Sequence, residues 1–292
     1  MDVVDRLLEL GGVARRSELV GSAADRRTLA AAVTQGTVRD LGGGWVAAVD
    51  ADPAVVAARR FNGTITCVSA APFYGLQQLR APQRVHMAVP RVRGARPDPR
   101  RREVVVHRES SWTRSPGLGL PLAPLVEVLA RALRCLPEDE AVTMVDSALK
   151  RRLISVEELD RALEGPGSLR ARTALQRCDG RSRSAIETTA RLALRAAGYD
   201  IEAGVPIPGV GEVDLVVAGR VVVECDGFSY HSGRHEYRED RRRDRALAAL
   251  GYITLRFTWE DVMNDPGVVV AAVRAVLDRD LGALPSPRPQ AS

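Results

Sequence analysis

The chain has 292 residues, of which 45% are hydrophobic, so it is long enough for two or more domains that each bury a core. No apolar run approaches the roughly 20 residues that span a bilayer, and the first residues lack the order of a secretory signal, which predicts a cytoplasmic protein without membrane contact. The formal net charge of +5 favours polyanionic partners, although Lys150 is the only lysine and an arginine-rich coding bias would give the same charge.

The first fifty residues predict three short helices followed by a tight hairpin. Apolar residues recur at helical spacing over residues 3–10, 16–20 and 25–35, and three glycines at 42–44 separate two strand-like segments. This is the order of a winged helix-turn-helix domain, in which Arg26 and Arg27 on the third helix would contact DNA. The segment resembles the winged-helix N-terminal domain of AbiEi-family antitoxins, which implies DNA binding; a plain three-helix scaffold is the alternative.

The middle of the chain, residues 51–177, predicts a mixed α/β domain. Strands are expected at 64–68, 85–89 and 103–107, and helices at 122–136, 139–150, 156–163 and 168–177. An arginine- and proline-rich loop at 91–102 either follows a phosphate backbone or is a solvated linker. The expected division is therefore a winged-helix domain at 1–50, this middle domain, a C-terminal domain at 178–282 and a disordered tail at 283–292.

Cysteines and histidines give little indication of a site. The four cysteines are far apart and include no CxxC pair, which favours buried free thiols over a disulfide framework or a cysteine zinc site: Cys67, Cys135, Cys178 and Cys225. His86 and His107 fall within apolar strand patterns, where a single histidine is more often a hydrogen-bonded core residue than a ligand. We therefore place none of these side chains in the predicted site.

The C-terminal domain has the clearest pattern. A helix at 184–197 precedes strands at 211–217 and 221–226, a basic helix at 236–250, a strand at 252–258 and a final helix with Asp265 as its N-cap. A three-residue connection at 218–220 places Asp214 opposite Glu224, with Asp226 diagonal to Asp214 on the same face. The opposite face then collects apolar residues: Val213, Leu215, Val217, Val221, Val223 and Cys225.

Three carboxylates on one patch repel one another unless a cation or protons offset their charge. A hard divalent metal suits oxygen ligands, so we predict that Asp214, Glu224 and the main-chain carbonyl of Cys225 bind Mg²⁺ or Mn²⁺. Such an ion would polarise a phosphate and lower the pKa of an attacking water. The alternative is that the acids are strand-end residues paired with nearby arginines.

Two further residues are candidates for the same site. His231 follows the flexible Gly227, has an unperturbed pKa near neutrality and is the candidate general acid or base, with a surface histidine as the alternative. Glu187 lies three residues after Ser184 in a capping-box pattern, where it would bond back to the Ser184 amide, and this structural role is sufficient on its own. Glu187 is therefore kept only as a further site candidate.

The basic helix carries a stripe of arginines at helical spacing, and the next strand adds one more: Arg238, Arg241, Arg242, Arg245 and Arg256. A basic stripe beside an acidic metal patch suits a phosphodiester substrate. Acids at i,i+3 spacing along the helix mean that salt bridges explain part of the pattern without any nucleic acid.

These residues together carry a resemblance. The C-terminal domain resembles bacterial proteins related to very-short-patch repair endonucleases, within the PD-(D/E)XK nuclease superfamily. The features that carry the resemblance are, in order, the first helix, Asp214, the Glu224-Cys225-Asp226-Gly227 run with His231, the arginine-rich helix and the strand at 252–257. The resemblance implies a restriction-endonuclease-like αβββαβ core, metal ligation at Asp214, a site acid at Glu224, and site roles for Asp226 and His231. Asp226 stands where the superfamily usually has lysine, and the repair branch uses histidine instead.

The expected fold class is therefore α/β (α+β), and the leading function is a metal-dependent endonuclease that hydrolyses phosphodiester bonds of DNA. The alternative is a non-enzymatic DNA-binding regulator of the antitoxin type, with a degenerate nuclease-like domain and a cognate toxin or other protein as its partner. A third interpretation is an interaction protein whose charge reflects coding bias alone.

Overall fold

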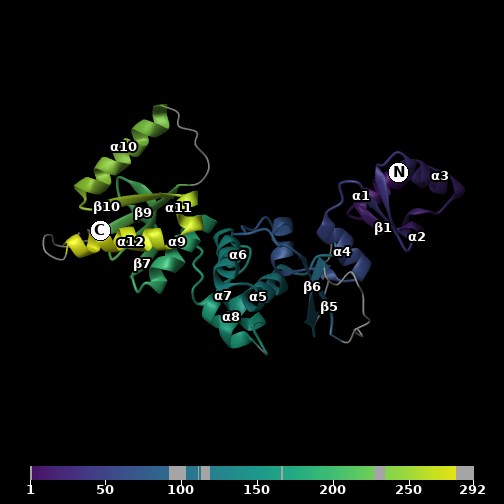
Figure 1. The fold of residues 1–292 in the computed structure, drawn as a ribbon, viewed down its shortest axis with the longest axis horizontal. Coiled ribbons are helices and arrows are strands. Elements are labelled where there is room, and N and C mark those ends of the chain that lie inside the picture. Colours follow the sequence, from purple (N-terminus) through teal and green to yellow (C-terminus); the bar gives the residue numbers. More distant parts are fainter. Residues whose placement is uncertain are drawn as a thin grey trace. The chain divides into compact units, whose positions relative to one another are not determined.

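The computed structural model describes residues 2–91, 103–110, 112, 119–165, 167–226 and 234–280, and for 234–237 and 280 the backbone alone. Its described residues form a mixed α+β fold with three sheets, as the sequence predicts (Figure 1). Contacts divide the chain into two compact units, one of residues 1–75 and 80–135, the other of 76–79 and the residues from 136 onward. The finer division at residues 50, 177 and 282 stays a prediction. Within the described ranges no helix has the length and apolar character to cross a membrane.

The first unit begins with three helices and a hairpin in the predicted order. Helices α1 (Val3–Glu9), α2 (Arg16–Leu19) and α3 (Ala23–Thr34) precede strands β2 (Val38–Gly42) and β3 (Trp45–Ala48). A short strand that the sequence does not reveal, β1 (Val13–Arg15), pairs with the other edge of β3, so the sheet order is β1-β3-β2. Buried apolar residues from all three helices and the hairpin form one core: Val3, Leu7, Leu19, Leu29, Val38 and Val46.

The rest of the first unit contains a second three-stranded sheet. Helix α4 (Pro53–Phe61), which the sequence analysis misses, precedes β4 (Thr64–Ile65), the 3-10 turns η1 (Cys67–Ala70) and η2 (Pro72–Tyr74), strands β5 (Val85–Pro90) and β6 (Val104–Glu109), and helix α5 (Leu125–Cys135). Strand β5 pairs antiparallel with β4 and parallel with β6. The strand expected at 64–68 is wrong beyond Ile65, because Cys67 adopts a left-handed φ of 54° that turns the chain into η1. The predicted basic loop from 92 to 102 lies outside the described residues.

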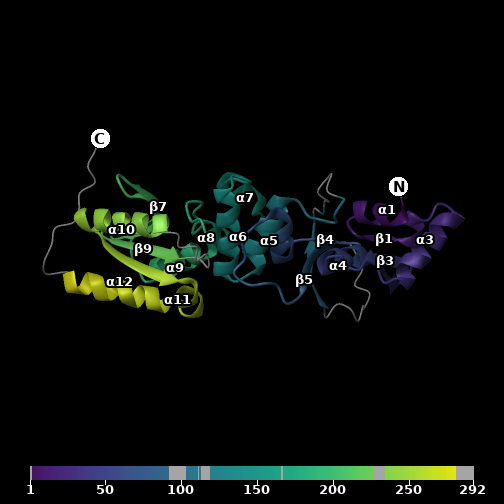
Figure 2. The same cartoon turned by 90° about the horizontal axis from the view of Figure 1, so that it is seen from above.

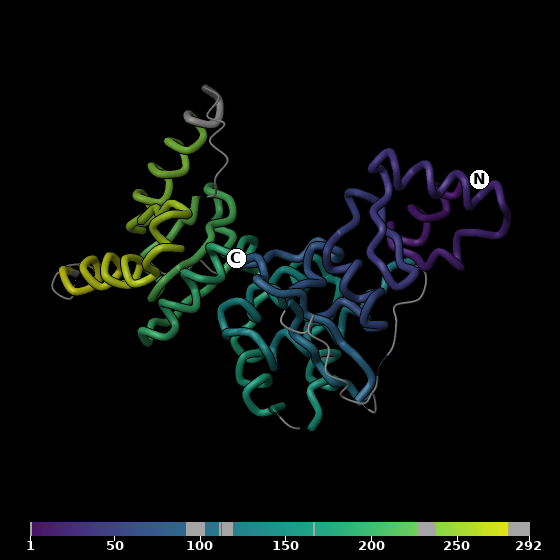
Figure 3. Tube along the Cα trace, turned by 45° about the vertical axis from the view of Figure 1, so that its right-hand side comes forward, coloured from purple at the N-terminus to yellow at the C-terminus, as the bar shows by residue number. Residues whose placement is uncertain are grey.

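The second unit opens with three predicted helices, α6 (Glu138–Lys150), α7 (Val156–Ala162) and α8 (Ser168–Leu175), which are among the teal coils of Figure 3. Helix α6 packs against α9 (Ala185–Ala196), and a fully buried ion pair between Asp146 of α6 and Arg191 of α9 joins them. The helical segment is thereby fastened to the α/β segment that follows.

The α/β segment of the second unit has the αβββαβ order that the resemblance implies, including a strand, β7 (Ile201–Ile207), that the residue pattern does not reveal. Helix α9 is followed by β7, β8 (Gly211–Val217), β9 (Val221–Asp226), α10 (Arg234–Ala249) and β10 (Ile253–Thr258), and then by α11 (Trp259–Asn264) and α12 (Gly267–Asp280). The sheet order is β10-β9-β8-β7, with β9 and β10 parallel and the other pairs antiparallel. Helices α9, α11 and α12 cover one face and α10 the other, as Figures 1 and 2 show.

The register of the β8–β9 hairpin agrees with the sequence prediction, since Val216 lies opposite Val222 across a connection at 218–220. One part of the prediction is wrong: Val213 does not join Leu215 on the α9 face but packs under α10, with Val216 and Val222. The strand pairing is interrupted at Asp214, because its carboxylate accepts the Cys225 amide at 2.8 Å in place of a main-chain partner. Both faces of the hairpin are consequently apolar cores, and the polar patch is confined to the strand ends.

Candidate functional site

Acidic residues meet where β8 and β9 separate beyond their paired region. Asp214 comes from β8 and Glu224 from β9, and Glu187 from the first turn of α9. Asp214 and Glu187 are buried, and the side chain of Glu224 is nearly so. A polar cluster this far from solvent needs compensating partners, because buried carboxylates are costly when unpaired.

Asp214 and Glu224 are held side by side by main-chain hydrogen bonds that cross between the strands. The Cys225 amide donates to Oδ2 of Asp214 at 2.8 Å, and the Asp214 amide donates to Oε2 of Glu224 at 3.3 Å. Each acid therefore replaces a rung of the β8–β9 ladder. The structure brings these two predicted site residues together.

Burial and mutual repulsion make this patch receptive to cations. Burial raises the pKa of Glu224 to about 7, and the negative charge of Asp214 adds to the effect while Arg243 opposes it. Burial likewise raises the pKa of Glu187, again with a contribution from Asp214. A positive charge placed between Asp214 and Glu224 would relieve this strain on the ionised forms.

Two arginines and one acid that the sequence analysis does not select complete the cluster. Arg183 donates to Oδ1 of Asp214 and lies 3.5 Å from Oε1 of Glu212. Arg243 of α10 donates to Oε1 of Glu224 at 2.9 Å and to the Glu212 carbonyl at 3.0 Å. Helical spacing could have pointed to Arg243. It stands four residues before Leu247, the buried residue that packs α10 on the sheet, and so lies on the same side of the helix. No pattern marks Arg183, which precedes the helix cap.

Glu187 combines a capping role with a place in the cluster. Ser184 caps α9 by accepting the Glu187 amide at 3.3 Å. The predicted return bond to the Ser184 amide is wrong, since Oε2 of Glu187 accepts the Arg183 amide at 2.7 Å and Oε1 accepts the Ser184 hydroxyl at 2.9 Å. The carboxylate thereby fixes the backbone of Arg183, whose guanidinium contacts Asp214.

The remaining predicted site residues are Asp226, Cys225 and His231. Asp226 is exposed at the end of β9, where it pairs with Thr258 of β10. The side chain of Cys225 is buried against the α9 face, and its carbonyl is the part predicted to bind metal. His231 falls outside the described residues, so its place stays a prediction. Among the described residues, the group of side chains close enough to chelate a metal lies in the first unit, at Cys67, His86, His107 and Cys135.

The predicted nucleic-acid contacts are exposed arginines, several of which are tied to acids. Arg242 bonds to Glu239 and to the Gly209 carbonyl. Asp244 is 4.0 Å from Arg241 and accepts from Arg256 at 2.6 Å. Arg238 and Arg245 share the exposed side of α10, and in the first unit Arg26 and Arg27 are exposed on α3. The salt-bridge explanation therefore accounts for part of the stripe.

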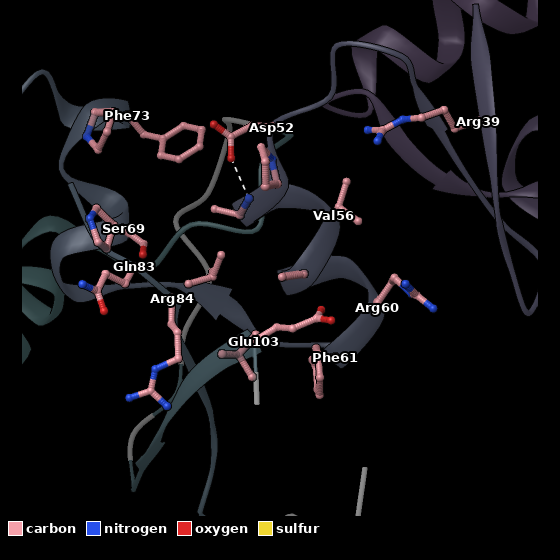
Figure 4. A pocket seen from close by; sticks show the side chains of 17 residues that line it. Arg39, Asp52, Val56, Arg60, Phe61, Ser69, Phe73, Gln83, Arg84 and Glu103 are labelled. Carbon is pink, nitrogen blue, oxygen red and sulfur yellow. Dashed lines mark hydrogen bonds between the residues drawn. The ribbon is translucent and has the colours of Figure 1, made fainter. Parts of the chain in front are cut away.

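A cavity of about 540 Å³ opens in the first unit beside α4, and Figure 4 shows its lining. Its walls combine apolar side chains with Arg39, Arg60 and Arg84. Asp52 is committed to capping α4 by accepting the Ala54 amide at 2.7 Å. The lining contains none of the predicted catalytic acids, so the cavity adds nothing to their cluster.

Comparison with known proteins finds a family match over the segment that contains these acids. The sequence model of REase_MTES_1575, a restriction-endonuclease-like family, matches residues 186–277, which include Glu187, Asp214 and Glu224. The second unit therefore carries a nuclease-like domain, of a type that generally uses a divalent metal.

Two curated relatives match a longer segment of the chain, and their names state no activity. "Uncharacterized protein MT2308" of Mycobacterium tuberculosis strain CDC 1551 / Oshkosh and "Uncharacterized protein Rv2248" of strain ATCC 25618 / H37Rv are each 31% identical over 169 residues, 54% of this chain. The chain covers 61% of the length of these relatives. A crystal structure of RV2827C protein from Mycobacterium tuberculosis matches 65% of this chain and 79% of that one, with 20% identity and a TM-score of 0.40.

Proposed function

We propose that the nuclease-like domain is a metal-dependent endonuclease that hydrolyses phosphodiester bonds of DNA. The observation that carries the proposal is the pairing of Asp214 with Glu224 at the separated ends of β8 and β9, inside the stretch that the restriction-endonuclease-like family matches. Two adjacent carboxylates with little access to water repel each other, and a divalent cation between them would offset that repulsion.

The donor set fits Mg²⁺ or Mn²⁺. Asp214, Glu224 and the Cys225 carbonyl offer hard oxygen ligands, and the raised pKa of Glu224 marks a position that gains from a positive charge. The bound ion would supply polarisation of the phosphate and a lower pKa for the attacking water. Arg183 and Arg243 provide the compensating charge in the structure, and they are the groups that would turn from the acids toward a phosphate oxygen.

The remaining residues have proposed roles in holding the substrate and moving protons. The exposed arginines of α10 and Arg256 would neutralise backbone phosphates, and His231 would act as the general acid or base. In the first unit, the order of α1, α2, α3 and the β2–β3 hairpin supports a winged-helix role, with Arg26 and Arg27 of α3 at the DNA. Kinship to the very-short-patch repair branch is part of the same proposal.

A second candidate is the antitoxin-type regulator, in which the nuclease-like domain binds nucleic acid or a toxin without cleaving it. The observation in its favour is that Arg183 and Arg243 already neutralise Asp214 and Glu224. Asp226, which stands where the PD-(D/E)XK superfamily usually has its lysine, also favours a protein that does not cleave DNA. This protein would bind a specific promoter with no metal requirement.

Supercoiled plasmid incubated with the full chain, with Mg²⁺, Mn²⁺ or a chelator, tests the two candidates. We expect nicking that requires metal, and a loss of about 100-fold, or roughly 3 kcal/mol of transition-state stabilisation, in Asp214→Asn and Glu224→Gln. Glu202→Gln is the matched control, because Glu202 is an exposed acid on β7 of the same sheet. Absence of nicking with both metals, or equal rates in parent and site variants, rejects the endonuclease, and metal-free binding to a promoter then supports the regulator.

A further inference from the structure

Four metal-ligating side chains meet in the first unit, in a place unrelated to the acids. Cys67 is the first residue of η1, His86 lies in β5, His107 lies in β6, and Cys135 is the last residue of α5. They are widely separated in the sequence, which is why their spacing predicts unrelated thiols and core histidines. The fold removes that separation.

The topology explains how these residues converge. The parallel register of β5 and β6 pairs His86 with Val105 and Ala88 with His107, so the two histidines lie diagonally on the same face of the sheet. The segment η1 packs against both β5 and α5, and the His86 amide donates to Oγ of Ser69 at 2.9 Å, which fastens η1 to β5. Four elements of secondary structure, η1, β5, β6 and α5, thus hold one side chain each.

The distances between the ligand atoms are those of a four-coordinate site. Nε2 of His107 lies 3.2 Å from Nδ1 of His86, and Sγ of Cys135 lies 3.9 Å from the same Nδ1. The thiols of Cys67 and Cys135 are within hydrogen-bonding reach, and all four ligand atoms lie within 4.8 Å of one another. Ligands around a tetrahedral zinc ion stand about 3.3 Å apart for two nitrogens and about 3.6 Å apart for nitrogen and sulfur.

We propose that Cys67, His86, His107 and Cys135 bind one Zn²⁺ ion in a tetrahedral structural site. Two thiolates and two imidazoles are a ligand set that Zn²⁺ prefers and Mg²⁺ does not. Four protein ligands fill the coordination sphere, so the site stabilises the fold and leaves no position for a substrate. Binding releases the protons of the two thiols.

Two simpler arrangements explain the cluster less well. A disulfide between Cys67 and Cys135 would use both sulfurs, whereas both cysteines are free thiols in the structure and Sγ of Cys135 lies 3.9 Å from Nδ1 of His86. A purely hydrogen-bonded core would not require Cys67 to hold a φ of 54°, a conformation seldom adopted by residues other than glycine. Such conformations persist where the surrounding structure holds them, and they cluster at active and ligand-binding sites.

Metal content of the full chain, purified without chelators and then dialysed against zinc, gives the direct test. We expect one zinc per chain in the parent, and loss of that zinc in Cys135→Ser and in His107→Gln. The matched control is Cys178→Ser, a half-buried cysteine outside the cluster, which should keep its zinc. Asp214→Asn should also keep it, so the outcome is independent of whether the acids bind metal or cleave DNA.

A measurement on the parent protein guards against variants that fail to fold. Cobalt substitution should give the visible absorption of a tetrahedral ion with thiolate ligands, and X-ray absorption at the zinc edge should show two sulfurs and two nitrogens. Chelation should lower the melting temperature of the parent. The proposal is overturned if zinc stays well below one per chain, if its ligands are oxygens alone, or if mass spectrometry finds Cys67 joined to Cys135.

Discussion

Two aspartates in the second unit are buried, and each is paired with an arginine. Asp146, only 2% exposed, accepts from the Asp179 amide at 2.7 Å, from the Thr188 hydroxyl at 2.8 Å and from Arg191 at 2.5 Å. Arg191 is fully buried and also donates to Oγ of Ser182 at 3.0 Å and to the Arg177 carbonyl at 2.7 Å. This pair is closed, because both partners are out of water and neither can be exchanged for a ligand.

Asp214 is buried like Asp146, but its arginine partner is far more exposed. It accepts the Cys225 amide and pairs with Arg183, whose side chain keeps 42% of its exposure. The guanidinium reaches in from solvent, and it can therefore leave without unfolding the domain. The comparison separates a closed pair that fastens α6 to α9 from an open pair, Asp214 with Arg183, whose cation is accessible to solvent and which forms part of the proposed metal site.

The largest expected effect is on the closed pair. Arg191→Met leaves Asp146 buried without its cation, which should lower the free energy of unfolding by about 3 to 5 kcal/mol near pH 7. Burial already raises the pKa of Asp146 to about 6, and loss of Arg191 raises it further. A group with a raised folded-state pKa gives stability that is lost as the pH rises through that pKa, so the gap between parent and variant should widen above about pH 6.

Urea unfolding of both proteins from pH 5 to 8 measures this effect. The control is the double variant Asp146→Leu/Arg191→Met, which removes both charges and should recover much of the loss, since an apolar pair of similar volume replaces an ion pair well. A single-variant loss below about 1 kcal/mol, with no dependence on pH, would show that the pair is not closed.

The sequence predicts the fold of the α/β segment because its signals are local and repeated. The alternation of valines in β8 and β9 sets the hairpin register, and the glycine-containing connection at 218–220 agrees with it. Val213 escapes prediction because a single side-chain bond, from the Cys225 amide to Asp214, interrupts the pleat. The alternation of apolar residues along a strand does not show where a side chain replaces a main-chain hydrogen bond between the strands.

The candidate site was predictable only in part, for a related reason. Asp214 and Glu224 are adjacent through the register of one hairpin, and a local pattern suffices to place them together. Arg183 and Arg243 reach the acids from separate elements, and the contact of His86 with His107 depends on which strands pair in parallel. Contacts of this kind depend on the tertiary topology, which the spacing of residues along the chain does not reveal.

The stability of the open pair, Asp214 with Arg183, should change more when metal binds than when Arg183 is removed. Arg183→Met should lower the free energy of unfolding by about 1 to 2 kcal/mol, less than Arg191→Met, because Asp214 is buried but Arg183 is 42% exposed and water can enter the vacated place. Mg²⁺ should bind this variant about tenfold more tightly than the parent, since no guanidinium competes for Asp214. At 100 times its dissociation constant, the ion should stabilise either protein by about 2.7 kcal/mol.

Calorimetric titration with Mg²⁺, together with melting temperatures at saturating metal, tests this response. Asp214→Asn serves as the control that should show neither binding nor stabilisation. If Mg²⁺ stabilises Asp214→Asn as much as the parent, or if Arg183→Met binds it more weakly, then Arg183 does not stand in for a metal and the distinction between closed and open pairs fails.

The smallest expected effect on stability concerns Asp226, an acid that belongs to neither pair. It is exposed at the last position of β9, so Asp226→Lys should change the free energy of unfolding by less than about 0.5 kcal/mol. The new ammonium would place a positive charge two residues beyond Glu224, where it can stabilise charge that develops on a phosphate. We therefore expect faster plasmid nicking with unchanged melting temperature. Asp226→Asn separates loss of a carboxylate from gain of an amine: if both variants nick equally fast, relief of repulsion at the open site is the cause, and if neither gains, Asp226 lies outside the reaction.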